Sequence, residues 1–152
     1  MQIVYLNECR NHIPDMAARF HSEWGRYHPT RKLSDVIHLL TERAEHTDRL
    51  DLSLVAIGTS TWMGSASLKQ YDMETVRDLS PWLSSVYVKP EFRNQGIARA
   101  LIEQIVTRAN DLGFKPLYLC TVDAENYYER LGWTRKRIAR ENGIDFVIME
   151  KA

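Results

Sequence analysis

Hydrophobic residues along the chain fall into short apolar runs and into longer stretches where they recur every three or four positions. The short runs are rich in β-branched and aromatic residues, and they are bounded by turn residues, which is typical of buried strands. Such runs are Gln2–Leu6, Leu52–Ile57, Trp62–Gln70, Trp82–Lys89 and Leu117–Thr121. The turn Gly58-Thr59-Ser60 joins the second run to the third, which predicts a hairpin there.

Three longer segments have the apolar spacing of amphipathic helices. The first extends from Ile13 to Tyr27, with Pro14 tolerated in its opening turn. The second extends from Leu33 to Ala44, and Ser34 is its expected cap. The third, Gly96–Leu112, has the clearest apolar stripe of the chain and precedes a terminating glycine.

The last part of the chain predicts one short helix and a second hairpin. Asp123 is the expected cap of a helix that runs to Leu131. Trp133–Arg140 and Ile144–Met149 then flank Asn142-Gly143, the strongest short hairpin signal in the sequence.

The resulting element order is β-α-α-β-β-β-α-β-α-β-β, without a repeat, a low-complexity segment or a linker. It predicts one α/β domain over residues 1–152, with a mixed, mostly antiparallel sheet of about seven strands flanked by about four helices. We expect parallel pairing wherever a helix crosses over.

Composition excludes several classes of protein. The 152 residues carry 20 basic and 20 acidic side chains, so the chain offers no basic field for nucleic acid. Two cysteines make neither a disulfide framework nor a metal cluster. The N-terminus does not resemble a signal peptide, and the longest uncharged stretch, Leu52–Leu68, is interrupted by glycines, so we expect no membrane span and a cytoplasmic protein.

The richest segment in chemical terms is the passage from Val86 to Arg99, where a strand leads through a short loop into a helix that opens at Gly96. The first amides of a helix have no partner within it, and the helix dipole adds positive charge, so this turn is suited to a phosphate. It lacks the glycine pattern of a Walker A or Rossmann loop. On geometry alone, an ordinary strand-to-helix turn explains it as well.

The pattern Val-x-Val-x-Pro-x-x-Arg-x-x-Gly-x-Ala, from Val86 to Ala98, resembles the acetyl-CoA signature of the GNAT superfamily of N-acetyltransferases. A second segment, Tyr127-Tyr128-Glu129-Arg130-Leu131-Gly132-Trp133, is similar to that family's Phe-Tyr-Glu-Lys-Leu-Gly-Phe. The element order also matches from Gln2 to Met149. The resemblance implies a GNAT-like fold and acetyl-CoA as cosubstrate, with no metal.

The resemblance also implies which residues hold the coenzyme. Backbone amides after Arg93 would bind the pyrophosphate, and Arg93 would orient the loop or touch a phosphate. The preceding strand would pair with pantetheine, and a bulge would splay it from Leu117–Thr121. The expected cofactor-binding residues are Val86, Tyr87, Val88, Arg93, Asn94, Gln95, Gly96, Ile97, Ala98 and Arg99, with Asn126 as a loose substitute for a family asparagine.

For catalysis, Tyr128 matches the family tyrosine that protonates the departing thiolate. The strand glutamate that serves many relatives as base is replaced here by Cys120. Asp72 is the favoured candidate base, with Glu74, Glu23 and a water held by Ser84 or Ser85 as alternatives, although each acid also fits a solvated surface charge.

Several other residues have two interpretations. Cys120 fits a small buried hydrophobe better than a nucleophile, which favours direct transfer in a ternary complex. His21 and His28 lack a third ligand, so they predict no metal site. Aromatic residues either shape an acceptor pocket or pack in the core: Trp24, Tyr27, His28, Trp62, Tyr71 and Trp82. The basic run from Arg130 to Arg140 either meets an anion or is a solvated strand face.

The sequence therefore predicts an enzyme that transfers acetyl from acetyl-CoA to a primary amine. The acceptor is an unidentified small molecule or peptide, and the protein is a monomer or homodimer. Two alternatives stay open, a non-catalytic module that binds acetyl-CoA and an enzyme that uses another acyl-CoA.

Overall fold

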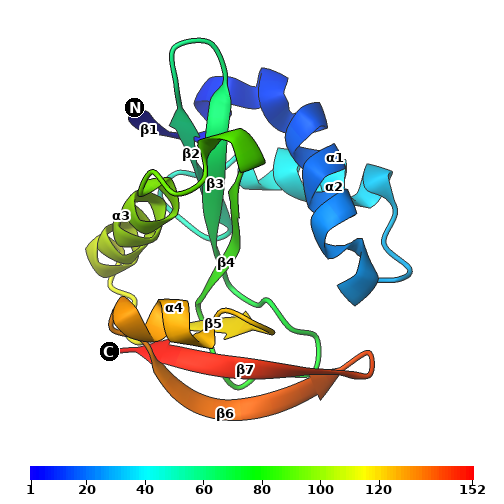
Figure 1. The fold of residues 1–152 in the computed structure, drawn as a ribbon, viewed down its shortest axis with the longest axis vertical. Coiled ribbons are helices and arrows are strands. Elements are labelled where there is room, and N and C mark those ends of the chain that lie inside the picture. Colours follow the sequence, from blue (N-terminus) through cyan, green and yellow to red (C-terminus); the bar gives the residue numbers. More distant parts are fainter.

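The computed structural model describes all 152 residues and contains one seven-stranded sheet (Figure 1). Its strand order is β1-β2-β3-β4-β5-β7-β6, and only the β4–β5 pair is parallel. The strands are β1 (Gln2–Tyr5), β2 (Leu52–Ile57), β3 (Trp62–Lys69), β4 (Trp82–Val88), β5 (Leu117–Thr121), β6 (Thr134–Glu141) and β7 (Ile144–Lys151).

Helices cover both faces of the sheet. The longest, α3 (Ile97–Asp111), packs against β2, β3 and β4 on one face. On the other face, α1 (Ile13–Trp24) and α2 (Leu33–Arg43) pack against each other and against the same strands, as Figure 1 shows. The short α4 (Glu125–Arg130) lies between β5 and β6 in sequence and contacts β6.

The predicted fold class and element order are confirmed, including the hairpin at Asn142-Gly143, where both residues have positive φ. Parallel pairing at every helical crossover was wrong. β1 and β2 are antiparallel neighbours, because two helices in succession return the chain to the end at which β1 stops.

Both predicted helix caps were also wrong. The N-cap of α2 is Lys32 rather than Ser34, and the Asp35 carboxylate accepts a 2.8 Å hydrogen bond from the Lys32 amide. At α4, the Thr121 hydroxyl accepts from the Ala124 amide, so Asp123 does not cap. In each case a side chain three residues away satisfies the free amide.

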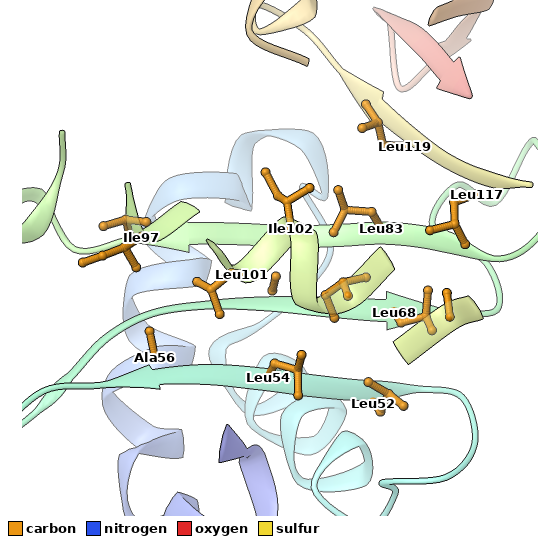
Figure 2. Close-up of a cluster of buried hydrophobic side chains, with 14 of the residues drawn as sticks. Leu52, Leu54, Ala56, Leu68, Leu83, Ile97, Leu101, Ile102, Leu117 and Leu119 are labelled. Atoms are coloured by element: carbon orange, nitrogen blue, oxygen red, sulfur yellow. The ribbon is translucent and has the colours of Figure 1, made fainter. Parts of the chain in front are cut away.

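Two hydrophobic clusters hold the helices to the sheet. The larger joins α3 to the strands through residues such as Leu54, Leu68 and Leu101, and Figure 2 shows this α3 face. The second joins α1 and α2 to Val55, Trp62 and Tyr87 from the opposite face. Because helices cover both faces, β2 and β3 are buried almost throughout rather than at alternate positions.

The sheet opens between β4 and β5. The two strands share a single residue pair, Trp82 with Tyr118, at the point where both begin. Beyond that pair they diverge, so the outer edge of β4 from Leu83 to Val88 has no strand partner. The splaying expected from the resemblance is therefore present at this position.

A β-bulge in β4 bends the strand at the same place. Ser67 pairs with Ser84 and Ser65 pairs with Tyr87, so Ser85 and Val86 together lie opposite one residue of β3. Ser85 has a φ of 54°, the left-handed region. Bulges of this kind bend a strand and increase its twist.

Gly64 of β3 lets the two strands approach closely beside the bulge. A Cβ at this position would lie 2.7 Å from the Tyr87 carbonyl oxygen and 3.3 Å from the Val88 Cα. Both are backbone atoms, which cannot move without shifting β4. The glycine is therefore required by the path of β4.

We expect Gly64→Ala to lower the free energy of unfolding by about 1–3 kcal/mol, the usual cost of overpacking a tight site. Gly58→Ala is the matched control, because its Cβ would meet the flexible Met63 side chain, with Sδ at 3.2 Å. Urea unfolding of the two variants measures the difference. Equal stabilities would show that β4 does not depend on the missing Cβ.

Candidate functional site

Two cavities meet at the gap beside β4. One is an open groove along the β4 edge and the start of α3. The other is a pocket of about 280 Å³ that is enclosed by α1, α2 and the diverging strands β4 and β5. Trp24 and Val86 line both cavities, so the bulge marks the point where they join.

The loop between β4 and α3 has a fixed local geometry. Pro90–Phe92 form a 3₁₀ turn, and Asn94 and Gly96 have positive φ values of 64° and 79°. Arg93 Nε donates to the Val88 carbonyl oxygen at 2.9 Å, and its guanidinium lies 5.8 Å from the Tyr87 ring centroid. Arg93 thus ties the loop back to β4.

Six consecutive amides, from Asn94 to Arg99, donate to no acceptor in the protein. The first backbone bond of this turn runs from the Ala100 amide to the Gly96 carbonyl oxygen at 3.1 Å. Ile97 is buried in the core beneath α3 and fixes the first turn of the helix. A Cβ at Gly96 would meet nothing within 4 Å, so the approach to these amides is open. The arrangement is an anion cradle.

The groove brings together nearly all the residues expected to bind a coenzyme. Val86, Tyr87 and Val88 line it, and the Tyr87 ring packs against Phe20, Trp24 and Trp62. Gln95 is exposed at the loop but does not line the groove, and the exposed Asn126 lines neither cavity. The structure therefore offers no ligand contact for Asn126.

The basic run separates into two parts. Arg130 lines the groove, whereas the other members lie on β6 and pair with acids, as in Arg135 with Glu125 at 2.6 Å and Arg137 with Asp78 at 2.7 Å. These exposed pairs match a solvated strand face.

The aromatic candidates also divide. Trp24, Tyr27 and His28 line the pocket, while Trp62 and Trp82 are fully buried in the core and Tyr71 stacks under Arg77. His21 also lines the pocket and contacts the Arg31 carbonyl oxygen at 3.2 Å. Burial, followed by the charge of Arg31, lowers the pKa of His28, so this imidazole is neutral at pH 7.

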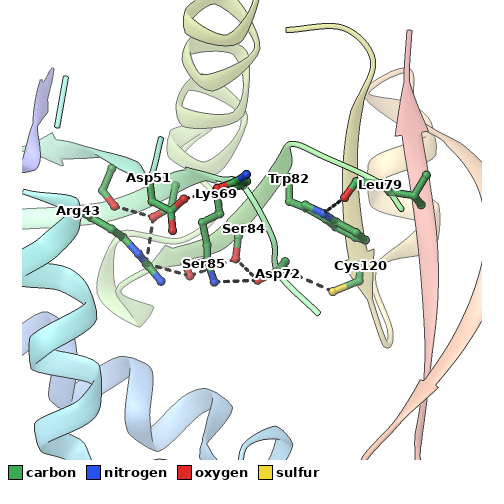
Figure 3. Close-up of polar contacts among 12 residues, drawn as sticks. Arg43, Asp51, Lys69, Asp72, Leu79, Trp82, Ser84, Ser85 and Cys120 are labelled. Atoms are coloured by element: carbon green, nitrogen blue, oxygen red, sulfur yellow. Dashed lines mark hydrogen bonds and ion pairs between the residues drawn. The ribbon is translucent and has the colours of Figure 1, made fainter. Parts of the chain in front are cut away.

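Asp72 lines the pocket and is the centre of a polar network (Figure 3). Its carboxylate accepts from Ser84 Oγ at 2.6 Å, Lys69 Nζ at 3.3 Å and Cys120 Sγ at 3.4 Å. Burial by itself would raise the pKa of Asp72, but the Lys69 charge and these hydrogen bonds outweigh it and lower the pKa. Asp72 is thus charged, and its negative charge is stabilised by Lys69 and by these hydrogen bonds. A carboxylate stabilised in this way is a weak proton acceptor.

The other proposed bases lie elsewhere. Glu74 is exposed and lines neither cavity, whereas Glu23 is exposed at the groove. Ser84 and Ser85 both line the pocket, and their hydroxyl oxygens lie 3.4 Å apart.

Tyr128 lies on α4 and lines the pocket, and its hydroxyl has no hydrogen-bond partner in the protein. Burial, with the neighbouring Tyr127, raises its pKa well above the ordinary value, so the phenol stays protonated. The Tyr127 ring lies 5.3 Å away and faces the groove instead. Burial and Asp72 likewise raise the pKa of Cys120, so this thiol is not a ready nucleophile.

Sequence reasoning missed two cations in the pocket, the buried Arg43 and the partly buried Lys69. Arg43 continues the apolar stripe of α2 after Val36 and Leu40. A charged residue on the buried stripe of a helix was the available signal.

The model of the acetyltransferase (GNAT) family matches residues 13–133. The chain belongs to this family. Membership makes it an acetyl-CoA-dependent N-acetyltransferase. The unpartnered amides and the open Gly96 position fit a diphosphate at the start of α3.

Solved structures share the fold across the whole chain. Ribosomal-protein-alanine N-acetyltransferase from Brucella melitensis superposes with a TM-score of 0.77 at 20% identity, covering 99% of each chain. Aminoglycoside 6'-acetyltransferase type Ii gives 0.75 at 14%, covering 100% of this chain and 97% of the other. Aminoglycoside 6'-N-acetyltransferase complexed with coenzyme A gives 0.76 at 12%, covering 99% and 96%. No curated protein matches the sequence.

The structure holds no group of three or more His, Cys, Asp or Glu side chains arranged to bind a metal ion. None of its helices combines the length and the apolar character that crossing a bilayer requires.

We expect Gly96→Gln to weaken CoA binding by at least tenfold, because its side chain projects from the cradle into the space the diphosphate needs. Gly113→Gln is the matched control, since Gly113 has a φ of 83° and equally open space at the far end of α3. Calorimetry with CoA compares the two. Equal affinities would remove this turn as the coenzyme site.

We expect Asp72→Asn to lower the free energy of unfolding by roughly 3 kcal/mol at neutral pH, because Lys69 loses its buried partner. The folded-state pKa of Asp72 lies below its unfolded value of 3.8, so its contribution is present above that pH and is lost as the pH falls through the lower folded pKa. Denaturant titrations of both proteins from pH 7 to pH 2 measure this difference. A difference that grows toward low pH would contradict the assignment.

Proposed function

We propose that the enzyme transfers acetyl from acetyl-CoA to a primary amine by direct attack within a ternary complex. The observation that carries this proposal is the junction of the two cavities at Val86, between six unpartnered amides and the pocket. A coenzyme held by its diphosphate at the start of α3 would direct its thioester along β4 to this junction.

The free edge of β4 supports a role in positioning the thioester. Its backbone from Leu83 to Val88 has no β5 partner, so it can pair with the amides of pantetheine as a strand would. The amide of Val86 lies at the bulge, where it can polarise the acetyl carbonyl. When both substrates are held side by side in this way, the reaction between them becomes effectively unimolecular.

Tyr128 is proposed as the acid. The acceptor nitrogen forms a bond to the acetyl carbon, the carbon–sulfur bond breaks, and the departing thiolate takes the phenolic proton. The free hydroxyl in the pocket and its protonated state support this role. The proton lost by the amine balances the proton that Tyr128 must regain.

The amine must be neutral to attack, and an alkylammonium has a pKa near 10, as lysine does. Asp72, the predicted base, touches Ser84, so a proton can pass through Ser84 or a water held there. Its lowered pKa supports a part in orienting Ser84 more than in keeping the proton. His28, whose imidazole is neutral, is a further basic group that lines this pocket.

A direct mechanism is favoured over an acetylated enzyme because the only cysteine in the pocket keeps its proton. The Cys120 thiol donates to Asp72, and an acetyl group on this sulfur would break that contact. A pocket that holds a free phenol and joins the coenzyme groove likewise favours turnover over a purely binding function.

We expect Tyr128→Phe to lower kcat by roughly 10²-fold, the low end of general-acid contributions, with CoA affinity changed less than about twofold. Tyr127→Phe is the matched control, because Tyr127 is adjacent and faces the groove rather than the pocket. A thiol-release assay over a panel of amines gives kcat, and calorimetry gives affinity.

Two outcomes would contradict the proposal. Equal kcat for Tyr128→Phe and the unmodified enzyme would show that Tyr128 is not the general acid. Tight CoA binding without thiol release on any amine would instead favour the binding module.

A further inference from the structure

We propose that the acceptor is a small amino carboxylate, and that Arg43 binds its carboxylate. This inference rests on the proposed amine acetylation and names the substrate class of the same pocket. Arg43 is a charged side chain of the pocket that has no part in the proposed acetyl transfer.

Arg43 is a buried cation with too few partners. Its side chain extends from α2 toward Ser85 (Figure 3) and lines the pocket, and the residue is only 5% exposed. Both of its hydrogen bonds come from Nη1, to Ser67 Oγ at 3.3 Å and Ser85 Oγ at 3.4 Å. Nε and Nη2 donate to no protein acceptor, yet neither is sealed from accessible space. Two adjacent guanidinium donors that remain free match the geometry of a carboxylate.

No carboxylate of the protein lies within ion-pair distance of this guanidinium, and Asp51 and Asp72 favour its charge only from farther away. Arg43 makes no ion pair within 4 Å, in contrast to Lys69, which pairs with Asp72 at 3.3 Å. Glu141, another acid of the pocket, accepts from the amide and hydroxyl of Thr75 at 2.9 Å and 2.8 Å. Burying an unpaired charge is costly, so an anionic ligand would restore a missing partner.

The position of Arg43 limits the size of the acceptor. Ser85, which Arg43 contacts, is the chain neighbour of Val86, where the two cavities meet. A carboxylate on Arg43 therefore lies within a few bonds of an amine at the junction, since neighbouring Cα atoms are about 3.8 Å apart. This spacing fits α-, β- and γ-amino acids. It does not fit polyamines, which would place a second cation against Arg43.

The test compares matched acceptors that differ only in the anionic group. Each α-, β- or γ-amino acid is compared with its own carboxamide, as a matched pair of acceptors, in a thiol-release assay with acetyl-CoA. We expect kcat/KM for the best amino acid to exceed that of its amide at least tenfold. In Arg43→Met this ratio should fall to about one, mainly through KM, since a charge-assisted bidentate contact is worth about 10- to 100-fold.

Arg43→Lys should restore part of the ratio, and Arg31→Met, which removes another cation of the same pocket, should keep most of it. A preference for amides or for polyamines would overturn the inference. So would an Arg43→Met variant that lowers kcat/KM equally for the amino acid and for its amide. If Arg43→Met fails to fold, the inference is tested by the ratio of kcat/KM for amino acid and amide in the unmodified enzyme and in Arg43→Lys.

Binding separates this inference from the proposed function. N-acetylated amino acids and their N-acetyl amides are unreactive probes of the same pocket in the presence of CoA. If no amine releases thiol, but the acids bind at least tenfold tighter than the amides and lose this in Arg43→Met, acetyl transfer fails while the carboxylate site stands. Equal binding of acids and amides removes the carboxylate site.

Discussion

The structure depends on the failure of β4 and β5 to pair beyond one residue. Trp82 and Tyr118 start the parallel pair, and the Ser85–Val86 bulge, made possible by the close approach at Gly64, then turns β4 away. A sheet with an interior gap exposes backbone donors and acceptors that are normally satisfied. Such a gap is tolerated where a ligand takes the place of the missing strand.

The same gap organises the chemistry on both sides. Toward α3, a left-handed turn presents the amides from Asn94 to Arg99, and Arg93 fixes that turn to β4. Toward α2, the diverging strands leave room for Asp72, Tyr128 and Arg43 in one pocket. The bulge residue Val86 lines both cavities, so in the proposed complex it sets the distance between the diphosphate and the acceptor amine. The site therefore follows from a defect in strand pairing rather than from a single motif.

Much of this arrangement could be predicted from local sequence. The helical period from Ala98 to Ala109 and the glycine at position 96 determine the anion cradle, since both act within one helix turn. The pairing of β1 with β2 and the surroundings of Arg43 could not be predicted, because they depend on contacts between α2, β3 and β4. The cap at Ser34 was wrong because α2 already begins at Leu33, where the Lys32 carbonyl oxygen accepts from the Asp35 and Val36 amides.

The central claim is that the amides opening α3 bind the coenzyme diphosphate. Backbone amide NMR with CoA, and with pantetheine as the fragment without diphosphate, tests this directly. The account predicts that CoA shifts the resonances from Asn94 to Arg99, and that pantetheine shifts only those near Val86–Val88. Resonances of residues 94–99 that stay in place at saturating CoA would contradict it.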